Sequence, residues 1–273
     1  MRCKYCFARF LDVKETVLPK GHLGLLDSIR TIKALSDFGF TKITFVGGEP
    51  TLCSWLPDLV KFAKQKKMTT CIVTNGSKID DEYLSKFNNS IDWITISLDS
   101  FNPNTIMKIG RHQNGKMVSW ADTLRISETA KKHGINFKIN TVVNSFNKDE
   151  NLAKNIDILS PKRWKIFQAL EIRGQNSDEF DEISISNDDF EKFIQSNVSH
   201  NKKIDIIPEN NELMTGSYIM VDPAGRFFDN VEGTYKYSKS ILDDGVSSAL
   251  SEIEIIEDRF YDRNGFYDWK RAV

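Results

Sequence analysis

The chain has 273 residues, of which 40% are hydrophobic and 27% charged, as is usual for a soluble globular protein. Its formal net charge of −1 provides no overall basic field, which argues against nucleic acid as a direct partner. The sequence has no apolar run of bilayer length and no recognisable secretory signal peptide, so we expect no membrane partner.

The first distinctive stretch, MRCKYCFARF, holds Cys3 and Cys6 in a C-x-x-C spacing. Taken alone, this pair fits a zinc site, a thioredoxin-like redox pair or an iron–sulfur ligand set. Zinc normally needs two further Cys or His ligands, and the 4 histidines do not form a second pair. The remaining cysteines, Cys53 and Cys71, are too unevenly spaced for a disulfide framework, so we expect a reducing cytoplasm.

Further along the chain, short β-rich runs alternate with segments of helical periodicity. The expected strands are KITFVGG, TTCIVTNG, DWITISLDS, FKINTVVNS and RWKIFQALEI. Helical segments between them include SWLPDLVKFAKQKK, DDEYLSKFNN and WADTLRISETAKKHG. This alternation predicts an α/β fold with a parallel sheet or barrel.

The ends of these strands carry polar residues and glycines: Gly47, Gly48, Glu49, Asn75, Ser97, Asp99 and Asn140. Active sites of parallel barrels lie at the carboxyl ends of the strands, so we expect a site there.

Three of the strands place cations on one face and bulky apolar residues on the other, because side chains alternate along a strand. These cations are Lys42, Lys138, Arg163 and Lys165, and Asn140 shares the face of Lys138. Helices bury the apolar face of such a barrel, so the cations point inward and call for a polyanion such as a triphosphate. The alternative is that they reach solvent at the strand edges or pair with Asp99, Glu49 or Glu171.

The pattern changes after Glu171. RGQNSDEFDEISISNDD is typical of an exposed acidic loop, and its end at Asn187–Asp189 is expected to cap a helix over FEKFIQSN. We therefore divide the chain into a core over residues 1–172 and a C-terminal extension over 173–273 that packs on the core and covers the nucleotide site.

The cysteine pair and the strand ends together resemble the radical S-adenosylmethionine (SAM) superfamily. Cys3, Tyr5 and Cys6 match the last two cysteines and the aromatic of its cluster-binding loop, and GGEP at 47–50 matches its SAM-binding stretch. The resemblance implies a partial (βα)6 TIM-like barrel. The family's first cysteine would stand four residues before Cys3, so we expect that the true start lies upstream and that the first barrel strand is missing.

Segments across nearly the whole chain are similar to the viperin family, in particular KITFVGGEP, IVTNGS, ISLDSF, FKINTVVNSFN, RWKIFQ and SKSILDDGV. This resemblance implies a [4Fe–4S] cluster, SAM and an electron donor such as flavodoxin or ferredoxin. It implies conversion of CTP, UTP or GTP to a 3′-deoxy-3′,4′-didehydro analogue, through 4′-hydrogen abstraction and loss of the 3′-hydroxyl. Such products terminate viral or phage RNA synthesis.

Residue roles follow from the same resemblance. The cluster would be held by Cys3 and Cys6. SAM would be bound by Tyr5, Gly47, Gly48, Glu49, Asn75, Ser97 and Arg111. The nucleotide would be bound by Lys42, Lys138, Asn140, Arg163, Lys165 and Tyr218. The resemblance names no proton donor.

Three alternatives stay open at this point: an inactive nucleotide-binding protein that lacks the third thiolate, a radical SAM enzyme of another reaction class, and a zinc-stabilised interaction module. The preferred base, the electron donor's identity and the oligomeric state cannot be read from the sequence.

Overall fold

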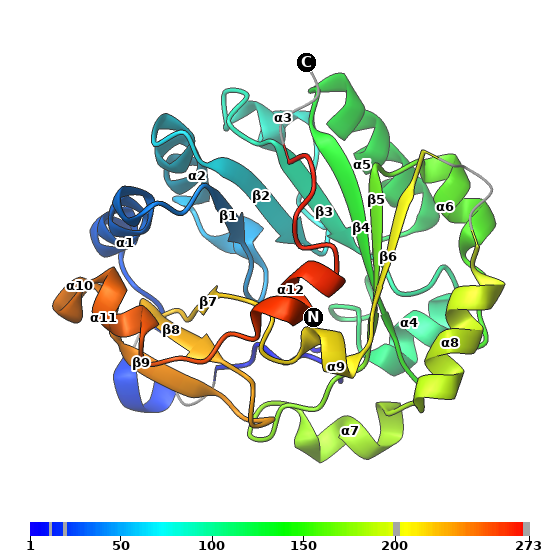
Figure 1. Cartoon of the computed structure of the whole chain (residues 1–273). Coiled ribbons are helices and arrows are strands. Elements are labelled where there is room, and N and C mark those ends of the chain that lie inside the picture. The colour runs from blue at the N-terminus through cyan, green and yellow to red at the C-terminus, as the bar shows by residue number, and fades with distance from the viewer. Residues whose placement is uncertain (11–12, 19–20, 199–202, 270–273) are drawn as a thin grey trace.

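The computed structural model describes residues 1–10, 13–18, 21–198 and 203–269. Six parallel strands form one curved sheet in the order β1-β2-β3-β4-β5-β6 (Figure 1). The strands are β1 (Lys42–Phe45), β2 (Thr69–Thr74), β3 (Trp93–Ser97), β4 (Asn136–Val143), β5 (Arg163–Gln168) and β6 (Asp205–Glu209). The predicted α/β partial barrel is confirmed.

Helices cover the convex side of this sheet (Figure 1). They are α1 (Leu25–Phe38), α2 (Leu56–Gln65), α3 (Asp81–Ser85), α4 (Pro103–Ile109), α5 (Trp120–Lys132), α6 (Ala153–Leu159) and α8 (Asn187–Ser196). A further helix, α7 (Ser177–Ile183), lies beyond the carboxyl ends of the strands (Figure 1). A π-helix (Val13–Val17) and a 3-10 turn (Pro50–Leu52) complete this part.

The main core forms where one face of the sheet meets these helices. The strand residues Ile72, Ile94, Ile139 and Ile166 are fully buried there among helix side chains such as Ile126. β-branched residues favour the strands and pack well on the pleated surface. The apolar faces predicted for β4 and β5 are therefore on the outer, helix-covered side.

The sheet continues past the boundary predicted at residue 172. β6 pairs in parallel with β5, from Arg163 opposite Asp205 to Phe167 opposite Glu209. The predicted strands covered only β1 to β5, so the run IDIIPE, which we placed in the extension, was assigned wrongly. Its proline obscured the strand pattern, although β6 lies at the end of the sheet, where a proline is tolerated.

The acidic stretch 173–189 is also more ordered than predicted. It contains α7, whose residues Phe180 and Ile183 pack with Tyr5 and Ile109. These two apolar side chains share one face of the helix and anchor a segment that looked like a loop from its charge. The following helix α8 is capped by Ser186, one residue before the cap that we expected.

A second, antiparallel sheet follows, with strands β7 (Met220–Val221), β8 (Arg226–Asp229) and β9 (Lys236–Ser240). Short helices surround it: α9 (Asn211–Met214), α10 (Ile241–Asp244), α11 (Val246–Leu250) and α12 (Glu257–Asp262). Phe227 and Ile241 pack against Leu35 of α1, which joins this region to the helices of the larger sheet. Within the described ranges, every helix is too short or too polar to cross a membrane.

Candidate active site

The cysteine pair lies in a tight turn that is fastened to the end of α4. The backbone N–H of Cys6 donates to the carbonyl of Cys3 at 3.0 Å, and that of Arg2 donates to Gly110 at 3.2 Å. Gly110 has φ +82°, and a Cβ there would lie 2.3 Å from the carbonyl oxygen of Arg2. Only glycine allows this approach, so the residue at 110 fixes where the cysteine loop can pack.

Both thiols of the pair are partly exposed. Burial raises the pKa of the Cys3 thiol above its ordinary value, against the opposing effect of Arg111. Two thiols on one turn suit iron, which iron–sulfur proteins bind through cysteine thiolates. In the part of the chain that the structure describes, no group of three or more His, Cys, Asp or Glu could hold a metal. The pair thus fits two positions of a three-cysteine cluster site.

Tyr5, between the cysteines, belongs to a buried polar network. Its hydroxyl donates to the Asp99 carboxylate and accepts from the Arg111 guanidinium. Arg111 also donates to Asp99 Oδ2 at 2.6 Å and to the Ser97 carbonyl at 3.2 Å. Burial raises the pKa of the Tyr5 hydroxyl well above its ordinary value, so the group stays a donor. Asp99 thereby joins two predicted SAM-binding residues, Tyr5 and Arg111, and Arg111 bonds the third, Ser97. Asp99 pairs with Arg111 and not with the lumen cations for which it was considered as a partner.

Glu49 is held by hydrogen bonds from two neighbouring segments. Its Oε1 accepts from the hydroxyls of Thr51 and Thr74, each at 2.6 Å, and its Oε2 accepts from the N–H of Asn75 at 2.7 Å. The carboxylate therefore links the turn after β1 to the end of β2. Gly47, close to it in the chain, has φ +137°, a conformation that favours glycine.

A narrow cavity brings three of the predicted SAM residues together: Asn75, Ser97 and Arg111 line it, together with Met1 and apolar side chains of β3 and α4. Gly47 and Gly48 are exposed and do not line it. Glu49 is connected to it through Asn75.

The concave side of the sheet carries the predicted cations. Lys138 on β4 stands opposite Arg163 on β5, and Asn140 stands opposite Lys165. Lys42 on β1 reaches the same space, since its ammonium donates to the Tyr267 hydroxyl at 2.7 Å and the ring of Tyr267 lies 3.8 Å from the Arg163 guanidinium. The four predicted cations thus converge in one lumen, away from the helices that bury the opposite face.

Two of the lumen side chains lack a partner. Lys138 has no hydrogen bond or ion pair with any described residue, and burial lowers its pKa to about 8. The buried Oδ1 of Asn140 accepts no hydrogen bond from the described chain. Buried polar groups are normally paired, so both groups are candidates to bind a ligand.

Lys165 is the predicted cation that an acid neutralises. Its ammonium pairs with the fully buried carboxylate of Glu209 and donates to the Tyr218 hydroxyl at 2.9 Å. Tyr218 in turn donates to Glu209. Burial lowers the pKa of Lys165 well below its ordinary value, and Glu209 opposes that shift. The predicted alternative of pairing with an acid is thus right for this lysine, although the acid is one we did not consider.

A further cation, Arg263, was missed by sequence analysis. Its guanidinium lies 3.7 Å from the Tyr218 ring centre and 3.9 Å from Glu209 Oε1, and it donates to the Ser217 carbonyl at 2.8 Å. It is buried, and its Nε has no partner among the described residues. No sequence signal pointed to it, because it lies in the mixed acidic and basic segment IEDRFYDR, outside the predicted strands.

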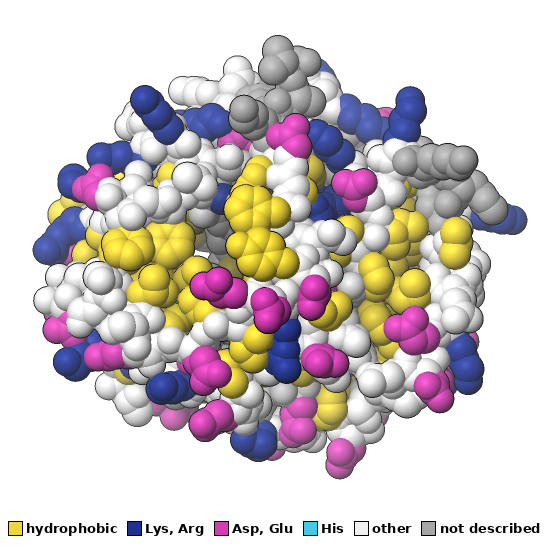
Figure 2. All heavy atoms as spheres, in the orientation of Figure 1, with side chains coloured by type: hydrophobic (Ala, Val, Ile, Leu, Met, Phe, Trp, Pro, Cys, Tyr) yellow, Lys and Arg dark blue, Asp and Glu magenta, His cyan; other side chains and the backbone are white. Residues whose placement is uncertain are grey.

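The segment after α12 crosses the lumen (Figure 1). The Tyr267 hydroxyl accepts from Lys42 at 2.7 Å, and its ring lies 3.8 Å from the guanidinium of Arg163. Arg163 also donates to the Asn264 carbonyl at 2.7 Å. Figure 2 shows hydrophobic side chains gathered over this place, bordered by acidic ones. Tyr261 of α12 and Phe266 of the following segment are exposed and stack on each other.

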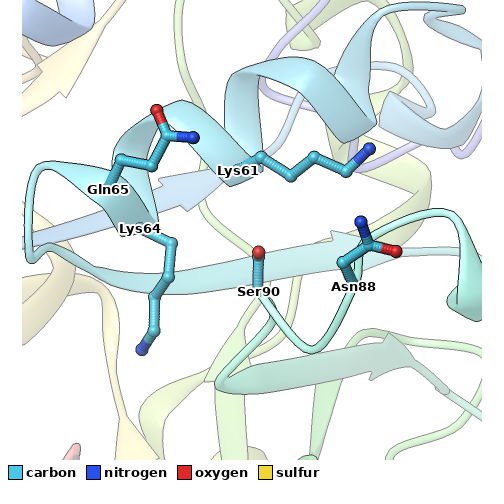
Figure 3. A pocket seen from close by; sticks show the side chains of 5 residues that line it. All are labelled: Lys61, Lys64, Gln65, Asn88 and Ser90. Carbon is cyan, nitrogen blue, oxygen red and sulfur yellow. The ribbon is translucent and has the colours of Figure 1, made fainter.

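A separate hollow lies at the other edge of the sheet, near the amino ends of β2 and β3 (Figure 3). Lys61, Lys64, Gln65, Asn88 and Ser90 line it. Lys64 is already paired with Asp92, at 2.6 Å. None of the predicted site residues is among its lining residues, so the site does not lie there.

Comparison with known proteins identifies the family of this chain. A family model described as the Radical SAM superfamily matches residues 1–159. Two relatives are each named S-adenosylmethionine-dependent nucleotide dehydratase: a Flammeovirga pacifica protein, 45% identical over 99% of this chain, and a Lacinutrix mariniflava protein, 46% identical over 98%. The chain spans 92% of the first relative but only 56% of the second.

Solved structures show the same fold. "Native anSMEcpe with bound AdoMet" matches with a TM-score of 0.63 and 16% identity, over 96% of this chain and 78% of that one. Streptococcus suis SuiB bound to S-adenosylmethionine matches with a TM-score of 0.59 and 16% identity, over 82% and 56%. The chain therefore belongs to the radical SAM superfamily and, within it, to the viperin family of S-adenosylmethionine-dependent nucleotide dehydratases.

Proposed function

We propose that this chain binds a nucleoside triphosphate in the lumen and converts it to a 3′-deoxy-3′,4′-didehydro nucleotide. The observation that carries the proposal is the gathering of five cations on the concave side of the sheet, Lys42, Lys138, Arg163, Lys165 and Arg263. Among the described residues, Glu209 pairs with two of them, Lys165 and Arg263. Charges buried without a counterion are costly, so this excess of cations calls for an anionic ligand. A triphosphate supplies oxygens for both the lysine ammonium groups and the arginine fork.

The other predicted residues would bind the ribose, cover the nucleotide or bind SAM. Asn140, with its unpartnered amide oxygen, would accept a hydrogen bond from a ribose hydroxyl. Tyr218 and the segment after residue 172 would cover the nucleotide. SAM would lie against Asn75, Ser97 and Arg111, with Gly47, Gly48 and Glu49 at its amino group and Tyr5 behind it.

Cys3 and Cys6 would hold the [4Fe–4S] cluster on the exposed side of this cavity. When bound, the cluster and SAM supply the one-electron chemistry that removes the 4′ hydrogen of the ribose. The chain's own contribution is to fix the sugar beside the SAM cavity and to keep water away from it. A flavodoxin or ferredoxin would donate the electrons, and the four free thiols support a cytoplasmic setting.

The direct test offers CTP, UTP and GTP separately to the anaerobically reconstituted protein with SAM. We expect 5′-deoxyadenosine and a dehydrated nucleotide with one of the three. The unpartnered amide oxygen of Asn140 supports nucleotide binding without reference to turnover, so a second candidate is a nucleotide-binding protein without turnover. That candidate predicts triphosphate binding by calorimetry but no 5′-deoxyadenosine with any nucleotide. Absence of triphosphate binding would contradict both.

Lys165→Ala tests the placement of the phosphates. We expect triphosphate affinity to fall by about tenfold or more, since a charge-assisted contact is lost, while SAM affinity changes little. Lys162→Ala is the matched control, because Lys162 is an exposed cation three residues earlier and should leave binding unchanged. Calorimetry with each ligand separates the two effects. Equal loss of nucleotide and SAM binding would show that Lys165 does not belong to the phosphate site.

A further inference from the structure

Asp99 connects three separate segments of the site. Asp99 is 1% exposed and lies two positions after the end of β3. Its Oδ2 accepts from the Tyr5 hydroxyl of the cysteine loop and from Arg111 Nε at 2.6 Å. Its Oδ1 accepts from the backbone N–H of Val142, near the end of β4, at 2.8 Å. Both carboxylate oxygens are therefore used, and each donor comes from a different part of the chain.

The backbone of Asp99 is fixed as well. Its carbonyl accepts from the side-chain amide of Asn147 at 2.8 Å, and Asn147 also donates to the Val142 carbonyl at 3.0 Å. These bonds hold Asp99 to β4, the strand that carries Lys138 and Asn140. They do not involve the cysteine loop. A rigid support of this kind is what a loop needs to hold ligands in one geometry.

Arg111 depends on this carboxylate for its charge balance. The Arg111 side chain is largely buried, and Asp99 is the acid that pairs with it. Without that acid, a buried guanidinium would be left unpaired, which is strongly unfavourable. Tyr5 would lose its acceptor at the same time. Both consequences fall on the cysteine loop and on the SAM cavity that Arg111 lines.

We propose that Asp99 is a positioning residue that orders the cysteine loop, through Tyr5 and Arg111, against the strand that carries the nucleotide-binding side chains. It acts before any cofactor binds, by holding the turn of Cys3 and Cys6 beside the SAM cavity. The functional importance of a well-ordered cysteine loop rests on the proposed function, in which the two thiols are cluster ligands.

The chain offers a matched control on the same strand. Asp92 directly precedes β3 and is also 1% exposed. It accepts from Lys64 at 2.6 Å and from the N–H of Thr70 at 2.9 Å. Asp92 and Asp99 are thus both buried, both paired with a cation and both bonded to a backbone N–H, but they stand at opposite ends of β3.

The experiment compares Asp99→Asn with Asp92→Asn by hydrogen exchange and mass spectrometry, on the whole chain without cofactors or nucleotide. The backbone N–H groups of Arg2, Lys4 and Cys6 are hydrogen-bonded in the loop and report its order. We expect Asp99→Asn to accelerate their exchange by about tenfold or more, since local opening is favoured once a buried charge-assisted bond is lost. Asp92→Asn should leave them at the rate of the unaltered protein.

Two further variants keep the result decisive. Tyr5→Phe removes only the hydroxyl and should loosen the same amides to a smaller degree, even if Asp99→Asn fails to fold. Asp99→Glu restores a carboxylate and should recover part of the protection, which a general loss of stability would not do. Unchanged loop exchange in both Asp99→Asn and Tyr5→Phe, or equal loosening in Asp92→Asn, would overturn the proposal. Because no nucleotide is used, these outcomes do not depend on whether the chain is a dehydratase.

Discussion

At the scale of single residues, burial controls the charge of the lumen lysines. Loss of water lowers the pKa of Lys42 and of Lys138 to about 8 in each case, and repulsion from Arg163 contributes to both shifts. A lysine whose pKa falls on folding binds its proton more readily in the unfolded chain. The empty protein therefore gains stability from these two groups as the pH rises from about 8 toward the ordinary value of 10.5.

Nucleotide binding should show the opposite dependence on pH. A triphosphate favours the charged ammonium, so binding raises both pKa values and takes up protons in the window between about 8 and 10.5. We expect the affinity for the triphosphate to fall as the pH rises through this window. Calorimetry in buffers of different ionisation enthalpy measures both the affinity and the protons taken up.

The control for this prediction is the double variant Lys42→Arg with Lys138→Arg. Its guanidinium groups keep their charge at alkaline pH, so its affinity should change less across the same window. An affinity that is equally independent of pH in the two proteins would contradict the assignment of these lysines to the phosphates.

At the scale of elements, the end of α4 determines where the cysteine loop packs. Gly110 caps this helix in the left-handed conformation, and its N–H donates to the carbonyl of Met107 at 3.0 Å. The open side of the glycine receives the backbone of Arg2. Helix capping and loop docking thus use the same residue.

Gly110→Ala should displace the cysteine loop, because the new methyl group would lie 2.3 Å from the carbonyl oxygen of Arg2. Gly115→Ala is a matched control, since Gly115 has a similar φ of +76° but no heavy atom within 4 Å of the place that a Cβ would occupy. The left-handed backbone costs each variant about 1 kcal/mol, and only Gly110→Ala adds a collision. Thermal unfolding and exchange of the loop amides measure the difference, and equal effects in the two variants would contradict the prediction.

Helices and strands could be predicted from the sequence where polar and apolar residues follow a regular pattern within one segment. Alternation along β4 and β5 correctly assigned Lys138 and Lys165 to the concave face, because side-chain direction depends only on strand geometry. β6 and α7 were missed because a proline and a run of acids masked their few buried residues. The partners Glu209 and Arg263 could not be predicted, since their contacts join segments far apart in the chain and depend on the fold.

At the scale of the whole molecule, α1 is shared by the two sheets. Ile32 packs toward α2 in the cluster that contains Leu59 and Met68, whereas Leu35 packs with Phe227 of β8. The same helix therefore buries side chains against both regions. We expect the two sheets to unfold together, because loss of α1 would expose a buried cluster on each side of it.

Leu35→Ala tests this coupling. Leu35 is 7% exposed, so its truncation should lower the free energy of unfolding by about 2–5 kcal/mol while a single transition is kept. Leu26→Ala, on the same helix but 76% exposed, should cost less than about 0.5 kcal/mol. Calorimetry and denaturant unfolding followed by two probes would reveal a second transition, and that result would show that the sheets unfold independently.

The segment at residues 264–269 has a consequence for how the protein matures. It supplies the Asn264 and Tyr267 groups that contact Arg163 and Lys42, yet it is translated after all nine strands of the described chain. During synthesis, the sheet can assemble while these two cations still face water. A chain whose segment 264–269 has not yet emerged from the ribosome would therefore present an uncovered, positively charged lumen, which cellular polyanions can occupy until that segment folds over it.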